Sequence, residues 1–353
     1  MQSLSLLAAS CVAAGAHAAS YSIIDLGTLG GASYAMGLNN FGQVVGYSTN
    51  SDGLERAFLY SGGSMTDLGT LGGETSRAYG INDAGQVVGQ ASDGSQNLAY
   101  IHQSGAMTAL GTFGGTNSAA LAINAAGQVA GYAQNAQGAE RAFIYDGMLN
   151  DIGTLGGARA TAFAINQHGN AVGEAIVGGL FEYHAFHFDG SGMTGLGTLG
   201  GSQSRATGIN ADGVIVGWSI TADNIVHAFR FKDGTMQDLG TLGGLSEAFG
   251  INAAGQIVGR SRIDGVGDTA FVFSDAYGML DLYTLAGGAA SGWSALLEAR
   301  AINDLGQIVG TGIIGGETRA FLMTPTAVPV PGAVWLLGSG LVFLVGAARR
   351  RAA

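Results

Sequence analysis

The chain has 353 residues, a formal net charge of −11, and 63 glycines but only three prolines. This acidic balance, with Lys232 as the sole lysine, disfavours binding to nucleic acid or other phosphates. An apolar fraction of 47% excludes a disordered chain, and the absence of a triplet glycine period excludes collagen.

The first 18 residues are typical of a secretion signal. An apolar run over residues 4–16 leads into an Ala-x-Ala pattern at 16–18, and Ala18 is the predicted cleavage position. The usual Lys or Arg at the start of such a signal is missing. A lipoprotein signal ending at Cys11 is the alternative, although Ala8 stands where that motif has leucine. Since Cys11 is the only cysteine, a processed chain would fold without disulfides.

A glycine-rich motif, Asp-Leu-Gly-Thr-Leu-Gly-Gly at residues 25–31, organises the rest of the chain. Close copies recur roughly 43 residues apart. They begin at Asp67, Ala109, Asp151, Gly195, Asp238 and Asp281. Turn glycines at fixed offsets and apolar runs too short for helices predict a repeat of four-stranded units, and seven copies suit a closed ring.

Each unit is predicted to begin after the Gly-Gly pair with a first strand that ends at an Asn. A Gly follows that Asn three residues later, as in 39–42, which predicts a tight turn capped by the Asn side chain. The second strand is the Gly-Gln-Val-Val-Gly segment, and the third is represented by 57–60. These runs are apolar without alternation, as expected for strands covered on both faces. The fourth strand, such as 65–68, leads into the next glycine motif.

The two ends of the repeat region complement each other. Residues 21–26 match a fourth strand with no unit before it, whereas the last unit stops at its third strand, residues 320–323. An open stack would more readily show atypical capping repeats, and none is evident. The sequence therefore predicts an all-β fold, a seven-bladed β-propeller of four-stranded blades over residues 19–324, closed by pairing of the N-terminal strand with the last blade.

Residues 21–324 resemble the HAF-repeat family of extracellular proteins. The naming tripeptide stands at 184–186 and 227–229, and Arg replaces its His at Arg56, Arg141 and Arg319. The resemblance implies an extracellular location and no assigned chemistry, so it supplies no catalytic residues.

The loops between second and third strands vary while the rest of the repeat is uniform, so they are the predicted place for recognition. The candidate residues are Asp52, Glu55, Asp93, Glu140, Phe181, Tyr183, Asp223, Asp264 and Asp268. Solvated turn chemistry is the alternative explanation of these side chains. Calcium could bind Asp52 with Glu55, or Asp264 with Asp268, but neither pair reaches the ligand count of a defined calcium loop. We predict no catalytic residue, resident cofactor or metal ligand.

The C-terminal segment, residues 325–353, combines a Pro linker, an apolar run and an Arg cluster. Its marker residues are Val328, Pro329, Pro331, Arg349, Arg350 and Arg351. The apolar run of about 16 residues predicts a short hydrophobic helix with the arginines on the cytoplasmic side. This tail resembles the PEP-CTERM sorting signal of Gram-negative envelope proteins, with Val330 in place of Glu. The resemblance implies processing by an exosortase-type membrane protease. A plain C-terminal anchor is the alternative.

These features together predict an exported binding or structural protein of the cell envelope, transiently held in the inner membrane by its tail. Extracellular polysaccharide or other surface proteins are the expected partners. Two other hypotheses remain: an enzyme acting on envelope glycans through acidic loop residues, and a calcium-stabilised adhesin.

Overall fold

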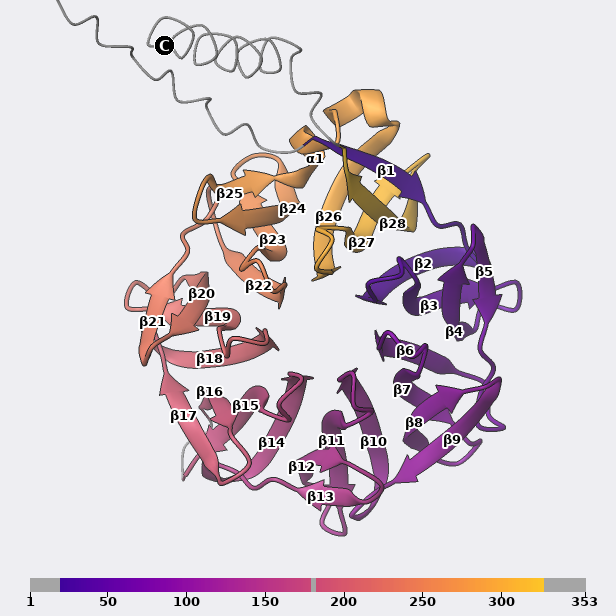
Figure 1. The fold of residues 1–353 in the computed structure, drawn as a ribbon, viewed down its shortest axis with the longest axis vertical. Helices are drawn as coiled ribbons and strands as arrows, with labels where there is room; N and C mark the ends of the chain where they lie inside the picture. Colours follow the sequence, from indigo (N-terminus) through magenta and orange to yellow (C-terminus); the bar gives the residue numbers. More distant parts are fainter. Residues whose placement is uncertain (1–19, 179–181, 327–353) are drawn as a thin grey trace, which may run out of the picture.

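The computed structural model describes residues 20–178 and 182–326, whose regular structure is almost entirely β-strand (Figure 1). The predicted signal with Ala18, the sorting tail with its hydrophobic helix, and the candidate residue Phe181 all lie outside these ranges. Among the described residues, no helix has the length and apolar character needed to cross a membrane.

The strands form four-stranded antiparallel units, numbered one to seven along the chain. The first strands are β2 (Gly30–Leu38), β6 (Ser76–Ile81), β10 (Gly114–Ile123), β14 (Gly156–Ile165), β18 (Gly200–Ile209), β22 (Ser246–Ile251) and β26 (Trp293–Ile302). The second strands are β3 (Val44–Asn50), β7 (Val87–Ser92), β11 (Val129–Asn135), β15 (Ala171–Val177), β19 (Ile215–Thr221), β23 (Ile257–Ile263) and β27 (Ile308–Ile314).

The outer two strands of each unit are shorter on average. The third strands are β4 (Glu55–Ser61), β8 (Asn97–Gln103), β12 (Glu140–Tyr145), β16 (Tyr183–Phe188), β20 (Val226–Lys232), β24 (Gly267–Ser274) and β28 (Glu317–Pro325). The fourth strands are β5 (Ser64–Asp67), β9 (Ala106–Gly111), β13 (Leu149–Asp151), β17 (Met193–Gly197), β21 (Thr235–Asp238), β25 (Gly278–Asp281) and β1 (Tyr21–Asp25).

The units are arranged around a common centre, with the first strand of each innermost and the fourth outermost (Figure 1). Units two and three are also joined by one parallel bridge, between Asn97 and Asn117. The predicted all-β repeat fold of four-stranded sheets is therefore confirmed, and its arrangement is propeller-like.

Strand β1 pairs with β28, although the two are separated by almost the whole chain. The register runs from Tyr21 opposite Pro325 to Asp25 opposite Phe321. The N-terminal strand thus supplies the fourth strand of the last unit, as the phase of the repeat predicts.

The core lies between neighbouring sheets. The third strand of each unit places an aromatic ring with no exposed surface at the same position: Phe58, Tyr100, Phe143, Phe186, Phe229, Phe271 and Phe321. A glycine of the second strand makes room for the ring and the adjacent strand. At Gly131, a Cβ atom would lie 2.0 Å from the Ala119 carbonyl oxygen and 3.0 Å from the Phe143 ring. This packing explains why the second strand ends its Val-Val run on glycine.

Two faces of the molecule are used throughout the following subsections. The turn face carries the Asn-x-x-Gly turns between first and second strands and the turns between third and fourth strands. The loop face carries the loops between second and third strands and the crossings to the next unit. Gly73 of one crossing donates its N–H to the Ser92 carbonyl at 3.0 Å, which places crossing and loop side by side.

Two details differ from the sequence prediction. In units one, three, four and five the first strand already begins at the first glycine of the Gly-Gly pair. After a shift in register, this glycine still pairs with the end of the second strand, so the first strand starts earlier than predicted. The second difference lies in the crossing that leads into the last unit. The crossing into unit seven contains α1 (Leu282–Leu285) and the 3₁₀ turn η1 (Gly288–Ser291).

At the start of this local helix, the side chain of Asp281 accepts hydrogen bonds from the backbone N–H groups of Tyr283 and Thr284. Such a bond caps a helix N-terminus. Leu282 is fully buried and Trp293 packs edge-on against Phe321, so the longer crossing is fixed by apolar contacts.

Candidate functional site

The predicted recognition residues that the structure describes lie on the loop face, but they are not gathered into one group. Asp52, Asp93, Asp223 and Asp264 occupy exposed loop positions in four different units. Glu140 and Tyr183 are the first residues of β12 and β16 and are half-buried. Glu55 borders one cavity and Asp268 borders another.

Several of the loop carboxylates are engaged in local structure. Asp93 accepts hydrogen bonds from the backbone N–H groups of Ser95 and Gln96, and these bonds lower the pKa of its carboxyl. The loop of unit one is similar, because Asn50 accepts from the Asp52 backbone N–H at 3.0 Å. Turn chemistry therefore explains these two positions without a ligand.

The first cavity, here called the junction cavity, lies where units six, seven and one meet. It has a volume of about 300 Å³ and is lined by Tyr34, Arg260, Asp268, Leu297, Glu298, Thr311 and Thr318. Asp268 and Thr318 directly follow the loops of their units, so the cavity lies on the loop side of the molecule.

The charged groups around the junction cavity are paired. Arg260 donates from Nε to Glu247 at 2.6 Å, Arg262 to Asp268 at 3.0 Å, and Arg300 lies 2.8 Å from Glu298. Burial alone would lower the pKa of Arg260, but the hydrogen bond and charge of Glu247, with Asp268 and Glu298, raise it overall. The guanidinium therefore stays charged in the wall of the cavity.

A second, smaller cavity lies between units one and two. It measures about 200 Å³ and is lined by Glu55, Thr75, Ser76, Arg77, Gln90, Ala91 and Asn97. Arg77 donates from Nε to Glu55 at 2.6 Å and its guanidinium lies over the ring of Tyr47, 4.9 Å from the centroid. Both loop-side cavities thus combine an arginine with a carboxylate at a junction between units.

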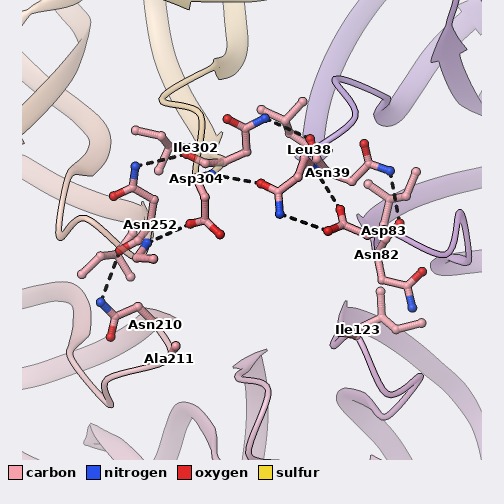
Figure 2. A pocket seen from close by; sticks show the side chains of 16 residues that line it. Leu38, Asn39, Asn82, Asp83, Ile123, Asn210, Ala211, Asn252, Ile302 and Asp304 are labelled. Atoms are coloured by element: carbon pink, nitrogen blue, oxygen red, sulfur yellow. Dashed lines mark hydrogen bonds between the residues drawn. The ribbon is translucent and has the colours of Figure 1, made fainter.

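The third cavity opens at the centre of the turn face and is built from the asparagine turns (Figure 2). Each Asn Nδ2 donates to the main-chain carbonyl of the equivalent Asn in the next unit, and the last, Asn303, donates to Asn39. The backbone N–H and Nδ2 of Asn40 also donate to the carboxylate of Asp83, while its Oδ1 accepts from the backbone of Asp304. These polar groups mostly satisfy one another around a cavity of about 250 Å³.

The Asn turns behave as predicted within each unit, since the Asn39 Oδ1 accepts from Phe41 and Gln43 backbone N–H groups. Their bonds between units had no signal in the sequence. The same is true of Arg77 in the first strand of unit two and of Arg260 and Thr311 in the second strands of units six and seven. The available clue was that one position of the second strand varies inside an otherwise uniform repeat. In successive units this position holds Tyr47, Gln90, Tyr132, Glu174, Trp218, Arg260 and Thr311.

Over the described ranges 20–178 and 182–326, the structure contains no group of three or more His, Cys, Asp or Glu side chains that could hold a metal ion. In each pair proposed for calcium, the two carboxylates are placed differently. Glu55 and Asp268 face arginines, whereas Asp52 and Asp264 are exposed in their loops.

No known protein family matches this chain, and no curated protein matches it. Among solved structures it is similar to a puromycin hydrolase mutant complexed with PGG, with TM-score 0.51 and 12% identity over 80% of this chain and 50% of that one. A putative TolB from Agrobacterium tumefaciens gives TM-score 0.48 and 11% identity over 88% and 99% of the two chains.

TolB from Acinetobacter baumannii gives TM-score 0.46 and 15% identity over 72% of this chain and 63% of that one. The chain thus spans half the length of the puromycin hydrolase and under two thirds of this TolB. At these identities the likeness concerns the fold alone.

Proposed function

We propose that this chain is a seven-bladed propeller, closed by β1 and β28, that is exported and works as a binding module of the cell envelope. Closure is supported by the β1–β28 register and by the hydrogen bonds between asparagines that run from unit to unit and return to Asn39. A ring protects the strand edges that an open stack would expose.

The observation that carries the proposal is the position of the two ends. The Thr326 backbone N–H donates to the Ser20 carbonyl at 2.8 Å, so the described chain enters and leaves at one place. That place lies on the turn face, because the side chain of Pro325 lies beside Gly306, which belongs to an Asn-x-x-Gly turn. A Cβ atom at Gly306 would be 3.2 Å from the Pro325 ring. A tail held in a membrane would therefore turn this face toward the membrane and the loop face away from it.

Display of the loop face fits a binding protein. The varied loops and the two arginine-lined cavities lie on the side opposite to the proposed anchor. The HAF-repeat resemblance and the PEP-CTERM-like tail belong to the same proposal, with an exosortase-type protease as processing partner and extracellular polysaccharide or surface proteins as ligands.

Binding is favoured over catalysis by the state of the loop-side carboxylates. Glu55 and Asp268 each accept a hydrogen bond from an arginine side chain. A glycan-cleaving enzyme instead needs two carboxyl groups that flank the scissile bond of the sugar. The paired carboxylates are better suited to accept hydrogen bonds from a ligand.

Protease accessibility on intact cells tests the proposed orientation. One variant of the full-length protein carries a specific protease site in the loop of unit three, between Gly138 and Ala139, and a second carries it between Gly62 and Gly63 on the turn face. Both insertion points are exposed glycine turns, so they are matched controls for each other. We expect faster cleavage at the loop site while the protein is membrane-held. Equal rates, or protection of both sites inside the cell, would contradict the proposal.

A further inference from the structure

The junction cavity differs from the rest of the loop face because three units contribute to its wall. Tyr34 comes from unit one, Arg260 and Asp268 from unit six, and Thr311 from unit seven. Its volume of about 300 Å³ is at the lower end of the range for small-molecule sites. A cavity of this size suits one ring-sized group rather than an extended chain.

One polar atom in this wall has no partner. Thr311 is only 3% exposed, and its Oγ1 makes no hydrogen bond to any described residue. A buried hydroxyl without a hydrogen-bond partner destabilises the folded protein. The buried hydroxyls of Ser33 and Ser76, by contrast, form hydrogen bonds that bridge neighbouring units. An unpartnered hydroxyl beside a cavity is therefore a sign of a missing ligand group.

Charge compensation limits the class of that ligand. The three arginines around the cavity, Arg260, Arg262 and Arg300, are matched by Glu247, Asp268 and Glu298. Because positive and negative side chains around the cavity are equal in number, a charged ligand would find no excess of the opposite charge there. It would also have to compete with the existing ion pairs. The balance favours an uncharged ligand.

The remaining groups match a polyhydroxylated ring. Arg260 reaches Asp268 only at 3.7 Å, so its terminal N–H groups can still donate, while the carboxylates of Asp268 and Glu298 have further lone pairs that can accept. Sugar hydroxyls both donate and accept, and so can bridge such neighbours. Tyr34, held by stacking on Tyr47 at a centroid distance of 4.8 Å, and Leu297 provide apolar surface for the C–H groups of the ring.

We propose that the junction cavity binds one uncharged pyranose unit of a polysaccharide, with Thr311, Arg260 and Asp268 as hydrogen-bonding residues and Tyr34 as the apolar platform. This inference rests on the proposed binding function and names its ligand class. The site belongs to units six, seven and one, where the sequence alone indicated only Asp268.

Titration calorimetry on the purified full-length protein tests the ligand class. The probes are the methyl glycosides of glucose, galactose, mannose and rhamnose, with glucuronic acid, glucosamine and alanine as charged or zwitterionic comparisons. We expect at least one neutral glycoside to bind with a dissociation constant on the order of 1 mM, as for a ligand of this size with ordinary efficiency. Binding by none of the neutral glycosides, or tighter binding of a charged probe, would overturn the proposal.

Substitution of Thr311 assigns the binding to this cavity. Thr311→Val removes the unpartnered hydroxyl, so we expect about fivefold weaker binding with an unchanged or higher melting temperature. Thr311→Ser should restore the affinity. In the matched control, Thr207→Val, a hydroxyl bonded to the Ala248 carbonyl at 2.7 Å is lost, which should lower the melting temperature and leave binding unchanged.

Wild-type affinity in Thr311→Val would refute the site even if sugars bind elsewhere. The two proposals also fail separately. A protein displayed on the envelope that binds no neutral glycoside refutes the inference alone, whereas a sugar-binding protein that remains inside the cell refutes the proposed location.

Discussion

At the scale of single residues, the aspartate of the repeated motif has two roles. Asp67 accepts the Gly69 backbone N–H through Oδ1 at 2.8 Å and pairs with Arg56 through Oδ2 at 3.0 Å. The pair joins the third strand to the fourth and sets the turn into the crossing. In unit two the aspartate is replaced by Ala109, and the arginine position is then Leu98. The Arg of the tripeptide and His227 are thus explained by an aspartate partner, whereas His184 has Gly195 at the position of that aspartate.

Tyr100 is the exception among the buried aromatic rings, because the other six units have Phe at this position. Its hydroxyl has no hydrogen-bond partner among the described residues, and burial raises the pKa of its phenol strongly. We predict that Tyr100→Phe stabilises the protein by about 1 kcal/mol, since an unsatisfied buried hydroxyl is removed without leaving a cavity.

Thermal unfolding of Tyr100→Phe should show a rise of about 2 °C for a domain of this size. The reverse change in the next unit, Phe143→Tyr, is the matched control and should lower the melting temperature. A lower melting temperature for Tyr100→Phe would indicate that the hydroxyl has a partner after all.

At the scale of elements, the asparagine turn connects local and long-range structure. Asn124 accepts the backbone N–H groups of Ala126 and Gln128 through Oδ1, which closes its own turn. Its Nδ2 donates to the Asn166 carbonyl at 3.0 Å and so fixes the next unit relative to this one. One side chain therefore sets both the turn and the spacing between sheets.

We predict that Asn124→Ala lowers the free energy of unfolding by about 3 kcal/mol, because the cap is lost and the buried carbonyl of Asn166 is left without its donor. Chemical denaturation should measure this loss. Asn97→Ala, at an exposed position of β8, is the control and should change stability by less than about 0.5 kcal/mol. Equal effects of the two substitutions would show that the bonds between turns contribute nothing.

At the scale of the whole molecule, the last unit depends on a strand from the other end of the chain. Strand β1 covers β28 over five residue pairs, and Leu26 packs with Phe58 and Leu322 in the core between units seven and one. In the proposed closed ring, the ends of the chain are joined through this sheet, so its loss would open both a sheet edge and a core.

A protein that starts at residue 27 should therefore melt at a lower temperature and aggregate more than one that starts at residue 19, because the edge of β28 is exposed. Size-exclusion chromatography and thermal unfolding of the two forms measure this. Ser22→Ala, at an exposed position of β1, controls for small changes in the strand. Identical melting temperatures and monomeric profiles for both starting points would argue against closure.

Local and periodic features were predictable from the sequence. The four strands of each unit, the Asn-x-x-Gly turns and the pairing of residues 21–25 with the last unit all follow from short patterns whose repetition reveals the phase of the fold. The helical crossing at α1 was missed because Asp281 has the same motif position as its equivalents, although Tyr283 replaces the glycine of the other copies and the spacing to Trp293 is longer.

The candidate site could be predicted only in part. Asp268 was found because it follows a varied loop, whereas Tyr34, Arg260, Glu298 and Thr311 lie inside strands, where the pattern indicates only a core position. The tertiary structure alone decided that these residues meet, that Arg77 and Glu55 pair, and that the chain ends share the turn face. The physical reason is that neighbouring units bring together residues far apart in the chain, and such contacts leave no trace in local spacing.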